Sequence, residues 1–286
     1  MFRSLLIITL FLSALLSSSC RAEMTEDERI VLDILQRSQQ NIWTSAHRID
    51  SLADYFLETP YVAATLESED GEENLVINLR ELDCMTFVEN VLALHRLLQE
   101  KEAHHYTQTR CLKRFPEILE NIRYRDGKRG DYSSRLHYTS EWIRNNSSKA
   151  YVKEISSLYS DSIYRVHLDF MSTHPQLYKA LTLHPDLVAK ISAIEASMEG
   201  YQLSYIPKEE LSRYEKDIPS GRIVAIVGST PGLDFAHLGF TYRKDGCLHL
   251  LHASSSGKKV MLSSGSLSDY LSDIKRFKGI VLLEVL

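Results

Sequence analysis

The sequence has few cysteines and lacks the motifs that bind zinc. Its 286 residues include four cysteines, but there is no paired C-x-x-C and no H-E-x-x-H, the usual signatures of structural and catalytic zinc sites. The adjacent His104 and His105 have no partners at metal-binding spacing. We therefore expect neither a metal ion nor any other cofactor.

The sequence also has no excess of positive charge. Its formal net charge is −5 at pH 7, so it lacks the electrostatic signature of a general nucleic-acid binder, and we expect no such partner. Basic residues do gather between Arg123 and Arg135. This cluster is either a solvated face or a site for a substrate that carries carboxylates.

Long apolar runs are missing beyond the N-terminus. The run from Leu5 to Leu16 follows Arg3 and is too short to span a bilayer, which predicts a secretory signal over residues 1–22 and export to the periplasm. Cleavage before Cys20 would leave a cysteine for lipidation and membrane attachment. Cleavage after Ala22 would release a soluble protein, and both alternatives stay open.

Without the signal, Cys84, Cys111 and Cys247 remain, an odd number that makes no disulfide framework. Cys84 directly follows Asp83, a favoured N-cap, and begins the clearest helical pattern, over residues 82–100. Because a helix N-terminus stabilises an anion, we expect a depressed pKa for the Cys84 thiol. The alternative is a small buried apolar residue.

A thiolate that cleaves an amide needs a partner to protonate the leaving amine, and imidazole suits this role. His237 begins a strand in which Leu238 and Phe240 would face the core and His237 the opposite side. His252 ends the next strand. Antiparallel pairing could bring it beside His237, where it would fix the orientation of that ring.

Tyr61 lies in an irregular segment upstream of the helix. Its phenol could donate a hydrogen bond to a developing oxyanion, with the Cys84 backbone amide as a second donor. The alternative is an ordinary core tyrosine.

The order of elements predicts an α+β fold in which N-terminal helices pack on an antiparallel sheet. We expect one domain over residues 23–286, enlarged by a helical and loop insertion over about 101–219. Helical patterns cover residues 25–39, 45–57, 82–100, 111–122, 140–143, 176–181, 187–197 and 266–274. Strand patterns cover residues 222–227, 238–242, 247–251, 259–262 and 279–285.

Four short segments resemble, in the same order, the motifs of the NlpC/P60 superfamily of papain-like cell-wall hydrolases. They are Thr59-Pro60-Tyr61, Leu82-Asp83-Cys84-Met85-Thr86-Phe87-Val88, His237-Leu238-Gly239-Phe240 and Leu251-His252-Ala253. Longer stretches are similar to the DUF1460 family of N-acetylmuramoyl-L-alanine amidases, at residues 78–89, 134–142, 205–208, 232–237 and 252–255.

The resemblance implies a papain-like core and a cysteine amidase that hydrolyses the bond between N-acetylmuramic acid and L-alanine in peptidoglycan fragments. It implies Cys84 as nucleophile, His237 as base, His252 as the orienting residue and Tyr61 at the oxyanion. Candidate substrate-binding residues are Arg80, Arg123, Arg135, Tyr138 and Asp234.

Two alternatives to this function stay open. One is a γ-D-glutamyl-diamino-acid endopeptidase of the cell wall, and the other is a non-catalytic lipoprotein that binds muropeptides. For the three arginines, the alternative to binding stem-peptide carboxylates is surface or structural pairing.

Overall fold

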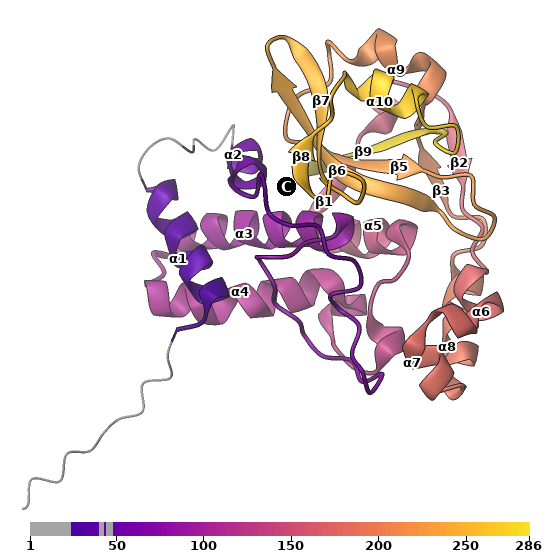
Figure 1. Cartoon of the computed structure of the whole chain (residues 1–286), viewed down its shortest axis with the longest axis horizontal. Helices are drawn as coiled ribbons and strands as arrows, with labels where there is room; N and C mark the ends of the chain where they lie inside the picture. The colour runs from indigo at the N-terminus through magenta and orange to yellow at the C-terminus, as the bar shows by residue number, and fades with distance from the viewer. Residues whose placement is uncertain (1–23, 40–42, 44–47) are drawn as a thin grey trace, which may run out of the picture.

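The computed structural model describes residues 24–39, 43 and 48–286. The predicted signal over residues 1–22, including Cys20, lies outside the described residues. A helical layer from the N-terminal part of the chain packs on an antiparallel sheet built mainly from the C-terminal part (Figure 1). None of the helices in the described part is both long and apolar enough to cross a membrane.

The helical layer begins where the capping residues predict. Thr25 caps the first helix and forms a capping box with Glu28, and Asp83 caps the third. The two helices predicted over residues 25–39 and 82–100 are therefore confirmed, with ends shifted by a few residues. The layer contains α1 (Glu26–Ser38), α2 (Arg48–Tyr55), α3 (Cys84–His104), α4 (Gln108–Arg123) and α5 (Thr139–Ser148).

The main sheet has seven strands, all antiparallel to their neighbours, in the order β1-β9-β5-β6-β7-β8, with β4 also paired to β9. All the predicted strands are present, as β5 (Ile223–Val227), β6 (Phe235–Lys244), β7 (Cys247–Ser254), β8 (Lys259–Leu262) and β9 (Gly279–Val285). The sequence did not reveal β1 (Val152–Glu154) and β4 (Ile206–Pro207), because two or three residues are too few to show a period of two.

Alternate residues of the strands enter two separate cores. On one face, Phe240 packs edge-on against Phe87 of α3, with ring centroids 5.4 Å apart. On the other face, Leu250 packs with α9 (Lys208–Tyr214) and α10 (Leu267–Ser272). The sheet therefore lies between two helical layers (Figure 1), which confirms the α+β class.

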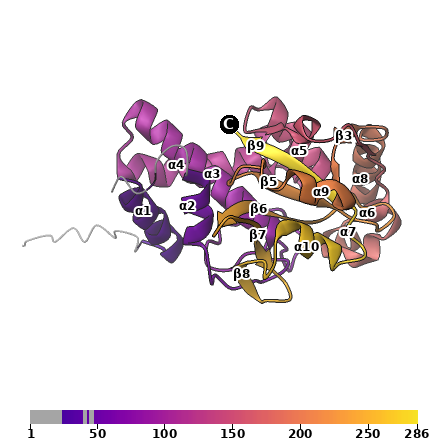
Figure 2. The same cartoon turned by 90° about the horizontal axis from the view of Figure 1, so that it is seen from above.

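The region of the predicted insertion carries a third core, formed by ten buried residues that include Tyr132, Tyr138 and Met171. Its helices gather at the end of the molecule opposite α1 and α2 (Figure 2). Strands β2 (Ile163–Arg165) and β3 (Gln202–Ser204) of this region form a separate pair. Its other elements outside the main sheet and the two helical layers are η2 (Arg125–Gly127), η3 (Tyr132–Ser134), η4 (Ser156–Leu158), α6 (Phe170–Thr173), η5 (Pro175–Leu177), α7 (Lys179–Leu183) and α8 (Asp186–Ser197).

Gly239 allows β6 and β7 to approach closely beside the two histidines. A Cβ at this position would lie 2.6 Å from the Leu251 carbonyl oxygen and 3.0 Å from the Cβ of His252. The first of these neighbours is backbone, which cannot move without disturbing the strand pairing.

We predict that Gly239→Ala lowers the free energy of unfolding by about 1–3 kcal/mol, because the added methyl group overpacks the strand pair. Urea denaturation measures this change. Gly130→Ala is the matched control, since a Cβ there would meet only ordinary contacts of 3.6 Å or more. Equal stability of the two variants would contradict the prediction.

Candidate active site

The local sequence places Cys84 at the first position of α3. Asp83 accepts a hydrogen bond from the Thr86 backbone N–H at 2.8 Å, and the Thr86 hydroxyl accepts one from the Asp83 N–H at 2.9 Å. This reciprocal cap confirms Asp83 as the N-cap. The thiol of Cys84 is free, as are those of Cys111 and Cys247.

Strand β6 runs past the sulfur of Cys84. The backbone N–H groups of Leu238, Met85 and Cys84 itself lie close enough to the sulfur to lower its pKa. Leu238 directly follows His237 in the chain. The packing of β6 on α3 therefore brings the predicted nucleophile and the backbone of the predicted base together.

Burial has the larger effect on the thiol. It raises the pKa of Cys84 to about 12, and the negative charge of Asp83 adds to the rise. The expectation of a depressed pKa is therefore wrong for the free protein. The helix N-terminus and the Leu238 amide do favour the anion, but they do not compensate for the loss of water around the sulfur.

His237 and His252 form a hydrogen-bonded pair, as the strand pattern predicts. Nε2 of His237 lies 2.6 Å from Nδ1 of His252, and the two rings are almost perpendicular at 87°. Burial lowers the pKa of His237 to about 3, with further contributions from His252 and Arg276, and burial also lowers the pKa of His252 to about 4. Both imidazoles are thus neutral at pH 7 and share one N–H.

The thiol of Cys84 and the ring of His237 are both neutral at pH 7 in the free protein, because the pKa of the thiol is raised and that of the imidazole is lowered. A reaction that uses them as nucleophile and base must therefore begin with a proton transfer.

Tyr61 is held beside the start of α3. Its N–H donates to the Lys258 carbonyl at 2.9 Å, and Tyr61 forms a parallel bridge with Leu82, two residues before Cys84. Burial raises the pKa of the phenol, and the negative charges of Cys84 and Asp83 raise it further. The hydroxyl therefore stays protonated and can act as a donor near the sulfur.

A cleft of about 240 Å³ is lined by the sequence neighbours of the predicted catalytic residues and not by Cys84, His237, His252 or Tyr61 themselves. Met85 on one side and Phe235 on the other place the cleft between the first turn of α3 and the first residue of β6. The rest of its lining comes from the insertion and from the loop before α3, and consists of Leu66, Glu67, Tyr132, Arg135, Leu136, His137, Tyr138, Thr139, Met171, Tyr178, Leu233 and Asp234.

Three of the predicted substrate-binding residues line this cleft, each with protein partners of its own. Arg135 is 5% exposed and pairs with Glu67 at 2.6 Å. The Tyr138 hydroxyl donates to Glu195 at 2.6 Å. The Asp234 carboxylate accepts the Ser140 backbone N–H at 2.6 Å. The Asp234 contact therefore joins the residue before β6 to α5, whereas the Tyr138 contact lies within the insertion.

The other two predicted substrate-binding residues lie elsewhere. Arg123 is 2% exposed, and its guanidinium pairs with Glu89 at 2.7 Å and donates to the Val76 carbonyl at 2.6 Å. Its assignment to substrate binding is wrong, because it is a buried structural partner that joins α3 to α4. Arg80 is exposed and pairs with Asp27 of α1 at 3.2 Å, outside the lining of the cleft.

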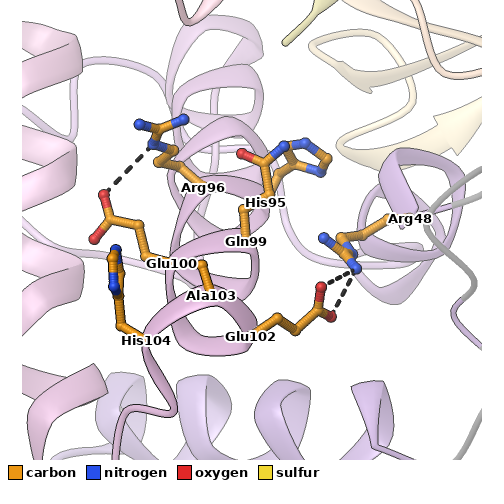
Figure 3. Close-up of a pocket in the computed structure, with 8 residues that line it drawn as sticks. All are labelled: Arg48, His95, Arg96, Gln99, Glu100, Glu102, Ala103 and His104. Carbon is orange, nitrogen blue, oxygen red and sulfur yellow. Dashed lines mark hydrogen bonds and ion pairs between the residues drawn. The ribbon is translucent and has the colours of Figure 1, made fainter.

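A hollow larger than this cleft lies elsewhere in the described chain. A cavity of about 610 Å³ lies beside the C-terminal half of α3 (Figure 3). Its charged residues pair with one another, Arg48 with Glu102 at 2.7 Å and Arg96 with Glu100 at 3.4 Å. No predicted site residue lines it. Across residues 24–39, 43 and 48–286, no group of three or more His, Cys, Asp and Glu side chains could hold a metal ion.

Sequence reasoning missed several residues around the site. Tyr270 of α10 packs against His252, with ring centroids 5.2 Å apart. Glu67, Tyr132 and Tyr178 line the cleft from irregular segments. No periodic pattern marks such positions, and only the tertiary structure brings them to the cleft.

Comparison with known proteins places the chain in a class of amidase-like proteins. A family model described as AmiA-like, N-acetylmuramoyl-L-alanine amidase-like, matches residues 51–280. The chain belongs to this AmiA-like family. No curated protein matches it.

Three solved structures are similar to the chain. An N-acetylmuramoyl-L-alanine amidase from Bacteroides uniformis is 40% identical, with a TM-score of 0.76 over 84% of this chain and 98% of that one. A Bacteroides fragilis protein, described as a candidate xylanase, is also 40% identical, with a TM-score of 0.73 over 82% and 99%. A Legionella pneumophila protein of DUF1460, 23% identical, shares the fold with a TM-score of 0.65 over 91% and 95%.

We predict that Arg123→Met lowers the free energy of unfolding by about 3–5 kcal/mol, because it leaves the buried Glu89 carboxylate without its partner. Urea denaturation measures the loss. The control is Arg80→Met, at an exposed ion pair worth at most about 1 kcal/mol. A variant of Arg123 that kept full stability and only weakened substrate binding would restore the original assignment.

We predict that iodoacetamide alkylates Cys84 slowly at pH 7 and about tenfold faster with each pH unit up to pH 10. The thiolate is the reactive form, and with a pKa near 12 its fraction keeps growing throughout this range. Peptide mapping of the labelled protein follows Cys84 and Cys247 together, both of which are partly exposed. A Cys84 rate that stayed constant from pH 6 to pH 9 would instead indicate a standing thiolate.

Proposed function

We propose that the protein is a cysteine amidase with a papain-like NlpC/P60 core, which hydrolyses the amide between N-acetylmuramic acid and L-alanine in muropeptides. The observation that carries this proposal is that His237 lies on β6, whose Leu238 amide is close to the sulfur of Cys84, and is paired at 2.6 Å with His252 of β7. Membership of the AmiA-like family supports the amide bond and the peptidoglycan-type substrate.

In the first step, His237 accepts the thiol proton while the sulfur of Cys84 attacks the lactyl carbonyl carbon. Because Nε2 of His237 faces His252, the proton arrives at Nδ1. The carbonyl oxygen becomes an oxyanion, and the Tyr61 hydroxyl and the Cys84 backbone N–H donate hydrogen bonds to it. The neutral His252 accepts the Nε2–H of the positively charged ring and stabilises it.

In the second step, His237 returns the proton to the nitrogen of L-alanine, the C–N bond breaks, and the peptide leaves with a free amino terminus. The muramoyl group remains on Cys84 as a thioester. His237 then takes a proton from water as the water oxygen attacks the thioester carbonyl. The C–S bond breaks and the muramic acid leaves with a free carboxyl group. His237 returns its proton to the sulfur, which restores the thiol of Cys84.

The cleft beside Cys84 is the proposed substrate site. Its walls come largely from the insertion, so we propose that it admits small muropeptides and excludes the intact wall. Arg135 would bind a stem-peptide carboxylate, in exchange for its contact with Glu67. We further propose that residues 23–286 act as one exported catalytic domain in the periplasm, with lipidation at Cys20 as one form of attachment.

The mass of the products separates this proposal from its rivals. An amidase frees a peptide that begins with L-alanine, whereas an endopeptidase leaves a dipeptide on the sugar. A binding protein forms no product. Because burial raises the pKa of the Cys84 thiol, slow alkylation is compatible with both a hydrolase and a binding protein, so product formation is the decisive measurement.

We predict that the protein converts a defined muropeptide into two products, the intact stem peptide and an N-acetylmuramic acid whose lactyl carboxyl group is free. Mass spectrometry detects both. Cys84→Ala should lower kcat by at least about 10³-fold, because it removes the nucleophile. The control is Cys247→Ala, which should keep wild-type kcat. Cleavage by Cys84→Ala at the wild-type rate, or a dipeptide left on the sugar, would refute the proposal. Xylan should remain intact in the same assay.

A further inference from the structure

The imidazole of His252 has an aromatic neighbour besides His237. Tyr270 of α10 lies against it, with ring centroids 5.2 Å apart and planes inclined at 65°. Phe277 packs on Tyr270 with ring centroids 6.0 Å apart, and both residues belong to the core on the α10 face of the sheet. The ring of His252 is therefore in contact both with its partner His237 and with a tyrosine that the core supports.

The orientation of the His252 ring determines at which of its nitrogens His237 can accept a proton. Nδ1 of His252 faces Nε2 of His237 at 2.6 Å. For His237 to take the thiol proton at its other nitrogen, its Nε2–H must have an acceptor, so His252 must keep its own hydrogen on Nε2. A half-turn of the His252 ring would replace the accepting Nδ1 by a carbon and remove this acceptor.

We propose that Tyr270 is a positioning residue for the reaction, because its ring prevents this half-turn and keeps Nδ1 of His252 directed at His237. The catalytic consequence depends on the proposed function, but the packing does not. Gly239 contributes to the same arrangement, because the Cβ of His252 occupies the space next to its missing side chain.

The chemistry of Tyr270 fits a packing role. Burial raises the pKa of its phenol, and the negative charge of Cys84 raises it further. The phenol of Tyr270 is thus neutral at neutral pH, and it lies near enough to the sulfur of Cys84 for the two groups to interact electrostatically. Arg276, on the loop that follows α10, acts electrostatically on both Tyr270 and His237. It is the charged group to consider when pH profiles of variants are interpreted.

The first test compares Tyr270→Phe, which keeps the ring, with Tyr270→Met, which fills the space with a flexible chain. We predict that Tyr270→Phe retains wild-type kcat on a defined muropeptide. Tyr270→Met should lose about 10- to 100-fold in kcat, with KM changed by less than about twofold, since a misplaced partner ring impairs proton transfer and not binding. Tyr270→Leu replaces Tyr270→Met if the latter does not fold.

The matched control is Tyr214→Met. Tyr214 packs on the same core as Tyr270, edge-on to Tyr159 with ring centroids 6.0 Å apart, but on α9. If Tyr214→Met lowered kcat as much as Tyr270→Met, the effect would come from the core in general and the proposal would be overturned.

The second test needs no substrate. Nitrogen NMR of the histidine rings reports whether Nδ1 of His252 accepts a hydrogen bond from His237 in the free protein. We expect an accepting Nδ1 in the wild type and Tyr270→Phe, and a partial loss of this hydrogen bond in Tyr270→Met. An Nδ1 that accepts as fully in Tyr270→Met as in the wild type would overturn the proposal. If the wild type cleaves no muropeptide, the proposed function fails, and the NMR result alone decides the role of Tyr270.

Discussion

The packing of β6 on α3 is the contact on which the candidate site depends. Phe240 meets Phe87 edge-on in the core, three residues beyond His237 on one element and three beyond Cys84 on the other. This contact sets the position of β6 along α3. The Leu238 backbone amide consequently lies close enough to the sulfur of Cys84 to lower its pKa. The helical half and the sheet half of the chain thus build one site, to which neither contributes a complete set of groups.

The same packing sets the electrostatics. It buries His252 and partly buries the sulfur and His237, which raises the pKa of Cys84 and lowers those of His237 and His252. At pH 7 the thiol and both imidazoles are therefore neutral in the free protein.

Much of this could be predicted from the sequence, for definite reasons. Asp83 and Thr86 carry a local capping signal, and His237 and His252 lie on strands with clear alternation, so both features were accessible. Arg123 shows the limit: a basic cluster looks the same whether an arginine faces solvent or is buried against Glu89. Tyr270 and the pKa of Cys84 depend on burial, which arises from contacts between distant segments and leaves no local pattern.

The position of β9 in the sheet has a consequence for biogenesis. Residues 279–285 pair with β1, β4 and β5, all of which precede them in the chain. Until this strand leaves the ribosome, its three partners lack their common neighbour and the sheet cannot close. Folding of the sheet therefore follows synthesis of the strand that completes it.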